Sequence, residues 1–251
     1  SQKNPLFCSL INLVVSEQKA KNNKVVILQS NYIPWKGYFD MINEADTFVF
    51  YDTVKYTKND WRNRNKIYPK NGVQWLTIPI AGSAVNLKIQ DVDITNSSWQ
   101  KKHAKTLGFG YRSCEHFSQL EEFIELFLVD KTWANLSELN ISIIKWISDK
   151  LGITTEFLNA NDLEVEGDRV KRLLEILQKL KATHYLSGPA ARGYMTPQLN
   201  EFADIGIDVS FKEYSNYKEY QQLGADFEQS VSILDMIAHI SWEKIPDFIW
   251  K

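Results

Sequence analysis

The sequence predicts an α/β protein with a mainly parallel β-sheet. Two stretches, residues 24–52 and 183–211, each contain an apolar strand, a loop with glycine and proline, a helix and a second strand. Strands joined by a helix-length crossover favour parallel pairing. The region between the two stretches is dominated by amphipathic helices. We therefore expect a Rossmann-like sheet of β-loop-α-β units with a helical insertion in the middle of the chain.

The first unit begins with the run 25–28, which is short and rich in β-branched residues, as is typical of a buried strand. A polar turn starts at Gln29, and a helix is expected over residues 35–45 before a second strand at 47–51. Open parallel sheets bind ligands at the carboxyl ends of their strands. The loops that follow these two strands should therefore line a site.

A cluster of cations follows the second strand, between positions 55 and 70, opposed only by Asp60. Guanidinium groups and backbone N–H groups at a helix N-terminus both bind phosphate oxygens, and aromatic rings offer a surface for stacking. A solvated basic turn has the same composition, but the position directly after a strand favours a site. The cations are Lys55, Lys58, Arg62, Arg64, Lys66 and Lys70, with Tyr56, Trp61 and Tyr68 between them.

Two more strands are expected at residues 73–80 and 87–94, the first after a turn of hairpin type at Asn71 and Gly72. The second contains Asp91 and Asp93, a DxD triplet of the kind that holds a metal and a nucleotide diphosphate in many glycosyltransferases. Alternation of apolar and polar residues along a half-exposed strand explains the triplet without a ligand. We predict no metal site there.

The rest of the chain contains helices and the second unit. Helices are expected at 99–108, 118–129, 133–151 and 168–180, with a capping box at Ser118 and Glu121 and Asp168 as an N-cap. Their apolar stripes are assigned to the core. The remaining expected elements are strands at 154–158, 183–187 and 207–211, a loop at 188–194, a helix from Thr196, a lid or binding loop at 214–220 and a final helix at 230–239.

Composition bounds the function classes. A net charge of −2 over 251 residues gives no general nucleic-acid signature. Cys8 and Cys114 match no zinc or redox spacing, which favours a reducing compartment and a cytoplasmic protein. No apolar run approaches the roughly 20 residues of a membrane span. The motifs of serine hydrolases and zinc proteases, GxSxG and HExxH, are absent.

We divide the chain into four parts. Residues 1–23 are expected to be an N-terminal extension, although a weak leader or an additional strand would also fit their apolar run. Residues 24–112 form the first α/β part with the ligand-edge motifs, and 113–182 the helical part. Residues 183–251 are a second α/β part that completes the same domain.

A set of short motifs extends from Lys24 to about His239. Its members are Gln29, Tyr32, Pro34, Trp35, Gly37, Tyr38, Phe39, Ala45, Asp46, Asp52, Arg64, Asn65, Ile67, Asn71, Gly72, Trp75, Leu76, Thr77, Pro79, Trp99, His103, Tyr185, Leu186, Ser187 and Gly188. These motifs resemble the WbqC-like protein family, with a departure at Ser30, where the family's opening motif has proline. The resemblance implies a role in bacterial surface-polysaccharide (O-antigen, lipopolysaccharide) biosynthesis. Members are proposed to modify amino sugars, including glycyl transfer onto 4-amino-4,6-dideoxyglucose.

The resemblance and the residue types together predict a site. His103, flanked by cations, is the expected acid–base residue, since histidine titrates near neutral pH. Asp52 ends a buried strand and should pair with an ammonium group or a cation. The residues expected to bind substrate are Gln29, Tyr32, Trp35, Tyr38, Lys55, Lys58, Arg62, Arg64, Asn65, Ser187, Gly188, Arg192 and Tyr194.

The cations and aromatic residues suit a nucleotide sugar, and the resemblance implies a transferase that forms an amide on the amine of such a nucleotide-linked amino sugar. The opening unit resembles the HIGH-type nucleotidyltransferase pattern, with Trp35 and Tyr38 in place of the histidines, so ATP with Mg²⁺ would activate glycine as an adenylate. An aminoacyl-tRNA is an alternative donor. Two other classes remain open: a non-catalytic module that binds a nucleotide sugar or glycan, and a metal-dependent glycosyltransferase that uses Asp91 and Asp93.

Overall fold

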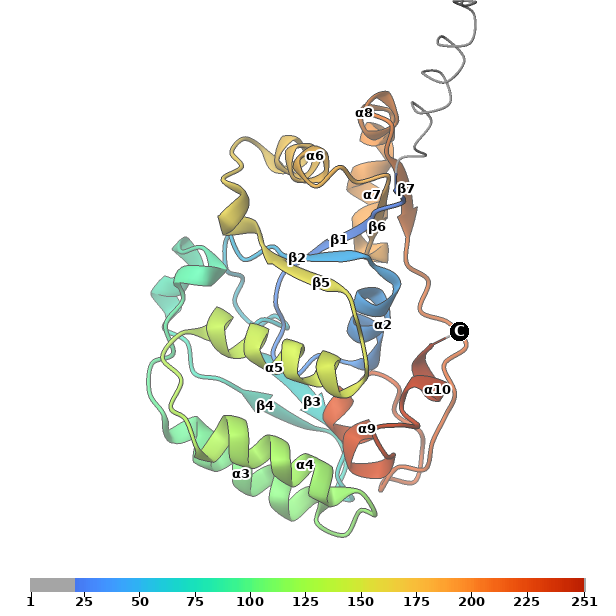
Figure 1. Ribbon diagram of the computed structural model, residues 1–251. Coiled ribbons are helices and arrows are strands. Elements are labelled where there is room, and N and C mark those ends of the chain that lie inside the picture. Colours follow the sequence, from blue (N-terminus) through green and yellow to red (C-terminus); the bar gives the residue numbers. More distant parts are fainter. Residues whose placement is uncertain (1–20, 251) are drawn as a thin grey trace, which may run out of the picture.

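The computed structural model describes residues 21–250 of the chain (Figure 1). Most of the predicted N-terminal extension, with Cys8, therefore lies outside the described residues. Within the described part, no helix combines the length and the apolar character that crossing a membrane requires.

A five-stranded parallel sheet forms the centre of the fold, in the order β5-β2-β1-β6-β7. The predicted α/β class with a parallel sheet is confirmed. The chain runs outward from β1 through β2 to β5 and then returns to build β6 and β7 on the other side of β1. This reversal places a topological switch point between β1 and β6, where parallel sheets open a crevice. The strands are β1 Lys24–Leu28, β2 Thr47–Phe50, β5 Glu156–Asn159, β6 His184–Ser187 and β7 Asp208–Phe211.

Successive side chains along β1 and β2 enter two different cores, one on each face of the sheet (Figure 1). Val25 and Ile27 pack in a smaller core with residues of α6 and α8, whereas Val26 belongs to a larger core with residues of α2 and α5. Because both faces are buried, the strands read as continuous apolar runs. The helices are α2 Lys36–Glu44, α3 Ser98–Tyr111, α4 Phe117–Ile124, α5 Leu136–Lys150, α6 Arg169–Lys179, α7 Arg192–Met195, α8 Leu199–Asp204, α9 Ile233–His239 and α10 Pro246–Ile249.

A second, two-stranded sheet lies on the side of α5 that faces away from the parallel sheet, near α3 and α4 (Figure 1). It is an antiparallel hairpin of β3 (Arg64–Ile67) and β4 (Gln74–Thr77). Gly72 in the connecting turn has a φ of +99°, a backbone conformation that glycine adopts without steric cost. The predicted turn at Asn71 and Gly72 is thus confirmed, while part of the stretch interpreted as a basic loop is the strand β3.

Three sequence predictions about local structure are wrong. Residues 87–94 form a short 3₁₀ helix and isolated bridges rather than a strand, because buried Ile89 and Val92 are three residues apart and share one side of a turn. The loop expected at residues 188–194 is helical from Pro189 onward, and α7 ends at Met195. The Ser118 side chain does not cap a helix, since α4 begins at Phe117 with His116 as its N-cap.

Truncating a side chain in the core should cost more stability than truncating one on the surface. Phe123 of α4 is fully buried, whereas Phe109 of α3 is 71% exposed. We expect Phe123→Ala to lower the free energy of unfolding by about 3–5 kcal/mol, since it removes buried area and leaves a cavity. The matched Phe109→Ala variant should change it by less than about 0.5 kcal/mol. Urea unfolding of both variants is the measurement, and equal losses would contradict the observed packing.

Candidate functional site

A cavity of about 930 Å³ opens at the carboxyl ends of β1, β2 and β6, where the switch point lies. Its floor comes from the strand ends around Leu28, Tyr51 and Ser187, and its walls from the following loops and the start of α6. The volume is within the roughly 300–1,000 Å³ of typical small-molecule sites. We call this cavity the basic pocket.

Five cations line the basic pocket: Lys55, Arg62, Lys88, Arg169 and Arg172. Among its described lining residues there is no aspartate, glutamate or histidine. Arg169 and Arg172 lie at the start of α6, where the positive end of the helix dipole disfavours cations. A cavity with this charge, placed at a helix N-terminus, is suited to an anion with several oxygens, such as a phosphate or diphosphate.

Several buried polar atoms of the basic pocket lack a protein partner. The Nε atoms of Arg62 and Arg172, the Tyr51 hydroxyl and the Thr53 hydroxyl are buried without a hydrogen bond to any described residue. An unpaired buried polar group costs about 1–3 kcal/mol, so such groups are normally satisfied. Their gathering around one cavity makes it a candidate site for a ligand rich in hydrogen-bond acceptors.

Aromatic rings hold two of the cations in place. The Arg169 guanidinium lies 3.6 Å from the centre of the Tyr194 ring, and that of Arg172 lies 5.9 Å from the Tyr51 ring. Burial raises the pKa of Tyr51, and the two neighbouring arginines act against that rise. The hydroxyl therefore stays protonated near neutral pH and remains a hydrogen-bond donor.

A second, smaller cavity of about 260 Å³ lies beside the basic pocket. We call it the tryptophan pocket, and its lining residues are Asn31, Trp35, Trp61, Asn65 and Ser230. Arg62 connects the two cavities: it lines the basic pocket, and its Nη1 donates to the Asn31 side-chain oxygen. Its Nη2 also lies 3.5 Å from a carboxylate oxygen of Asp60.

Asp52 lies in a third cavity, of about 280 Å³, with Asp91, Glu138 and Asp162 among its lining residues. Its carboxylate is buried and accepts hydrogen bonds from the backbone N–H of Ser30 at 2.8 Å, the Ser30 hydroxyl at 2.6 Å and the Ser137 hydroxyl. The partners of Asp52 are thus neutral hydrogen-bond donors of the protein, and not the ammonium group or cation that the sequence predicted. The family proline expected at position 30 would lack the N–H that Ser30 donates.

His103 lies inside the protein and lines none of these three cavities. Its Nδ1 is 2.8 Å from the Tyr32 hydroxyl, and its Nε2 is 3.1 Å from the carbonyl oxygen of Thr77. Burial lowers the pKa of His103 to about 4. These contacts fasten α3 to β4 and the β1–α2 loop, and its acid–base role stays a prediction.

The structure brings only part of the predicted site together. Gln29, Lys55, Arg62, Ser187, Gly188 and Tyr194 line the basic pocket, and Trp35 and Asn65 line the tryptophan pocket. Tyr32 and Tyr38 are buried, and the Tyr38 hydroxyl donates to the Gln29 carbonyl oxygen at 2.9 Å. Three cations lie outside the three cavities: Lys58, Arg64 over the Trp75 ring and Arg192 over the Phe211 ring.

Residues 29–246 match the WbqC-like protein family, and the match begins at the first loop of the basic pocket. The chain belongs to this family. The resemblance predicted from the sequence is therefore confirmed. A relative from Mycobacterium tuberculosis, the uncharacterized protein Rv1507c, is 39% identical over 227 residues, which cover 90% of this chain and 97% of that protein. No solved structure matches the chain significantly.

The opening motif of this WbqC-like chain shapes the loop between the two cavities. A side chain at Gly37 would place its first carbon 2.2 Å from the Trp35 ring, so the motif needs glycine there. Trp35 in turn packs edge-on against Tyr214, with ring centres 4.8 Å apart. The hydroxyl of Tyr217 donates to Asp40. Two tyrosines of the predicted lid, Tyr214 and Tyr217, thus pack against Trp35 and α2.

Sequence reasoning missed Arg169, Arg172, Tyr51 and Lys88. The stretch around Asp168 was interpreted as a helix start with a core-facing stripe, and Asp168 does cap α6 through a 3.0 Å bond from the backbone N–H of Lys171. Two arginines in the first turns of a helix oppose its dipole. Two arginines in this unfavourable position were the feature of the sequence that could have pointed to an anion site at the start of α6.

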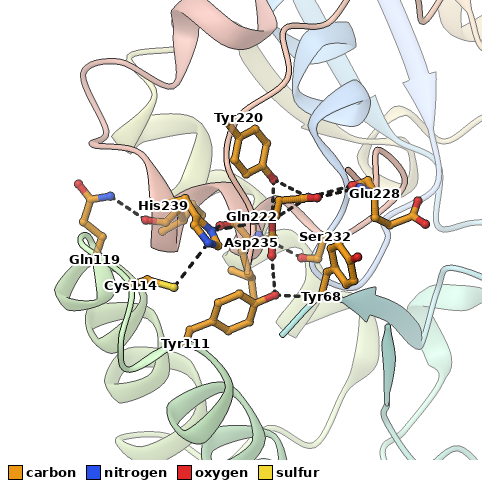
Figure 2. A network of polar contacts seen from close by, with 12 residues as sticks. Tyr68, Tyr111, Cys114, Gln119, Tyr220, Gln222, Glu228, Ser232, Asp235 and His239 are labelled. Atoms are coloured by element: carbon orange, nitrogen blue, oxygen red, sulfur yellow. Dashed lines mark hydrogen bonds and ion pairs between the residues drawn. The ribbon is translucent and has the colours of Figure 1, made fainter. Parts of the chain in front are cut away.

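A separate polar network surrounds Asp235, whose side chain is fully buried (Figure 2). Its carboxylate accepts hydrogen bonds from Tyr111 at 2.8 Å, Tyr220 at 2.7 Å and Gln222 at 3.0 Å. Burial raises the pKa of Asp235. The network joins α3, α9 and the coil between β7 and α9.

The same network brings Cys114 next to a histidine, a pairing that the sequence did not indicate. Its sulfur lies 3.6 Å from Nε2 of His239, whose Nδ1 lies 2.7 Å from the Asp235 carbonyl oxygen (Figure 2). Burial, together with the Asp235 charge, raises the pKa of the Cys114 thiol to about 11. A thiol that stays protonated is a weak nucleophile. Within the described residues, no group of three or more His, Cys, Asp or Glu side chains is arranged to hold a metal.

His103 should make the protein sensitive to acid. Its pKa in the folded state, about 4, lies below the ordinary value of 6.5, so the unfolded chain binds the proton more readily. Stability should therefore fall as the pH drops from about 6.5 to about 4, by up to about 3 kcal/mol at 1.36 kcal/mol per pKa unit. His103→Gln should flatten this part of the curve in urea unfolding measured at several pH values. Identical pH dependence of stability in wild type and variant would show that His103 is not the cause of the acid sensitivity.

Proposed function

We propose that the protein binds a nucleotide-linked amino-dideoxy sugar in the basic pocket and forms an amide on its amine, for surface-polysaccharide biosynthesis. The observation that carries the binding step is the charge of this pocket: five cations and, among the described lining residues, no acidic one. A diphosphate supplies the acceptor oxygens that Arg62 Nε and Arg172 Nε lack. Membership of the WbqC-like family supports an amino sugar as the rest of the ligand, because the family resemblance implies the modification of amino sugars.

The amide step requires an activated acyl group. The amine nitrogen attacks the acyl carbon, a C–N bond forms and the amine loses one proton. The leaving group departs with the electron pair of the broken acyl–oxygen bond. It is AMP if ATP has first activated glycine as an adenylate with release of pyrophosphate, or the free tRNA, through the oxygen of its 3′-terminal ribose, if an aminoacyl-tRNA is the donor. Cations beside the reacting centre favour such a leaving group because they stabilise its developing negative charge.

A second candidate function is a non-catalytic module that binds a nucleotide sugar. The specific observation in its favour is that no histidine, aspartate or glutamate is among the described residues of the basic pocket, so the pocket offers no ordinary proton acceptor. Asp52 lines the third cavity, and its oxygens already accept hydrogen bonds from Ser30 and Ser137. Turnover separates the two functions.

Binding can be tested at Arg172. We expect Arg172→Ala to weaken the binding of nucleoside diphosphates by about 1.5–3 kcal/mol, the scale of a hydrogen bond to a charged group. Arg112→Ala is the matched control, because Arg112 is exposed and lies over the Phe109 ring, outside the cavity. Titration calorimetry with uridine, thymidine and guanosine diphosphates measures both. If Arg172→Ala binds as the wild type does, the basic pocket is not the phosphate site.

Catalysis can be tested with defined substrates. The protein is incubated with a nucleotide-linked 4-amino sugar, glycine, ATP and Mg²⁺, and in parallel with glycyl-tRNA in place of glycine and ATP. We expect a product heavier by one glycyl group by mass spectrometry, and AMP release only in the first mixture. Arg172→Ala should lower product formation at substrate concentrations below KM. Binding of the sugar nucleotide without product in either mixture would favour the binding module.

A further inference from the structure

The tryptophan pocket has the size and the chemistry of a site for one ring. Its volume of about 260 Å³ lies below that of pockets for drug-sized ligands. In contrast to the basic pocket, its lining carries no charged side chain within the described residues and combines two indole rings, two amides and a hydroxyl. An uncharged ring with several hydroxyl groups fits this lining.

Trp61 gives the pocket an exposed aromatic surface that the fold holds in place. Its side chain is 42% exposed, yet it stacks on Trp75 with ring centres 5.7 Å apart and planes inclined by 25°. Arg64 lies over the Trp75 ring at 4.4 Å, and the Trp61 carbonyl oxygen accepts a 3.0 Å hydrogen bond from the Tyr32 backbone. A large aromatic side chain that is both exposed and fixed is suited to stacking with a ligand ring.

Polar groups of the pocket are free to bind hydroxyl groups. The side-chain amide nitrogen of Asn31 and the hydroxyl of Ser230 make no hydrogen bond to any part of the chain that the structure describes. Asn65 is different, because its amide nitrogen already donates to the carbonyl oxygens of Tyr32 and Ile33. Asn31 and Ser230 are therefore the groups that would recognise the ring's substituents.

Arg62 lies between the two cavities, so a ligand bound beside it is close to both. The guanidinium lines the basic pocket while holding Asn31 at the edge of the tryptophan pocket. In a sugar nucleotide the sugar is attached directly to the diphosphate. A diphosphate near Arg62 and Arg172 would thus place its sugar next to Trp61.

We infer that the tryptophan pocket is the sugar subsite, in which the sugar ring of the nucleotide-linked ligand stacks on Trp61 while its phosphates occupy the basic pocket. This inference rests on the proposed function. It assigns Trp61, Asn31 and Ser230 to recognition of the sugar. It assigns the arginines to the phosphates that all such ligands share.

Calorimetry with matched ligands tests the assignment. The probes are uridine, thymidine and guanosine diphosphates, each with and without an attached hexose, titrated into wild type, Trp61→Ala, Trp61→Phe and Arg172→Ala. We expect Trp61→Ala to lower the affinity for the hexose-bearing ligand about tenfold and to change the affinity for the matching diphosphate by less than twofold. Trp61→Phe should restore most of the loss, because a ring remains for stacking. Arg172→Ala should weaken both ligands by a similar factor.

The outcomes are distinguishable. Equal weakening of both ligands by Trp61→Ala would assign Trp61 to the base and overturn the sugar subsite. No effect of Trp61→Ala on either ligand, with both weakened by Arg172→Ala, would overturn the subsite and leave the proposed phosphate site standing. Failure of every probe to bind the wild type would overturn both. Thermal unfolding of the Trp61 variants checks that they are folded, with Phe109→Ala as the control for losing an exposed ring.

Discussion

The buried carboxylate of Asp235 fixes α9 and the coil before it to α3. An ionised group without solvent must be hydrogen bonded or paired, and Tyr111, Tyr220 and Gln222 together meet that requirement. These donors come from α3 and from the coil before α9, which also supplies Ser230 to the tryptophan pocket. At the start of α9, Ser232 pairs with Trp35 and donates its backbone N–H to the Lys66 carbonyl oxygen. The wall of a surface cavity therefore depends on a carboxylate in the interior.

The second constraint is the parallel sheet itself. Because β1 pairs with β2 on one side and β6 on the other, three loops leave the same edge within reach of one another. The loops after β1 and β2 each contribute to both cavities, through Gln29 and Asn31 in one case and Lys55 and Trp61 in the other. The same loops thus line a charged cavity and an aromatic cavity, and Arg62 of the first binds the side chain of Asn31 in the second. A ligand with a charged part and a neutral part matches that arrangement.

Several patterns set by neighbouring residues were readable from the sequence, although the alternation at 87–94 misled, and most contacts across the fold were not. The apolar runs of β1 and β2 and the N-cap Asp168 were predicted because each depends on neighbouring residues. The strand order explains why Gln29, Arg62 and Ser187 meet, and the rule for carboxyl edges anticipated it. His103 shows the limit: its residue type suits catalysis, whereas its burial against Tyr32 and Thr77 is a tertiary property that the residue type does not reveal. Arg169 and Arg172 were missed because a helix start was explained by its cap and its stripe alone.

The crowding of cations in the basic pocket has a consequence for how the protein balances stability against activity. Like charges held close together at a helix N-terminus repel one another, and the folded chain retains that repulsion to keep the pocket preorganised. An anion that binds only the folded state relieves it and shifts the folding equilibrium by mass action. Ligand occupancy and resistance to unfolding are then linked quantities. If the proposed anion binds, the occupied protein is the more stable form, and the repulsion that the anion relieves lies at the first turn of α6.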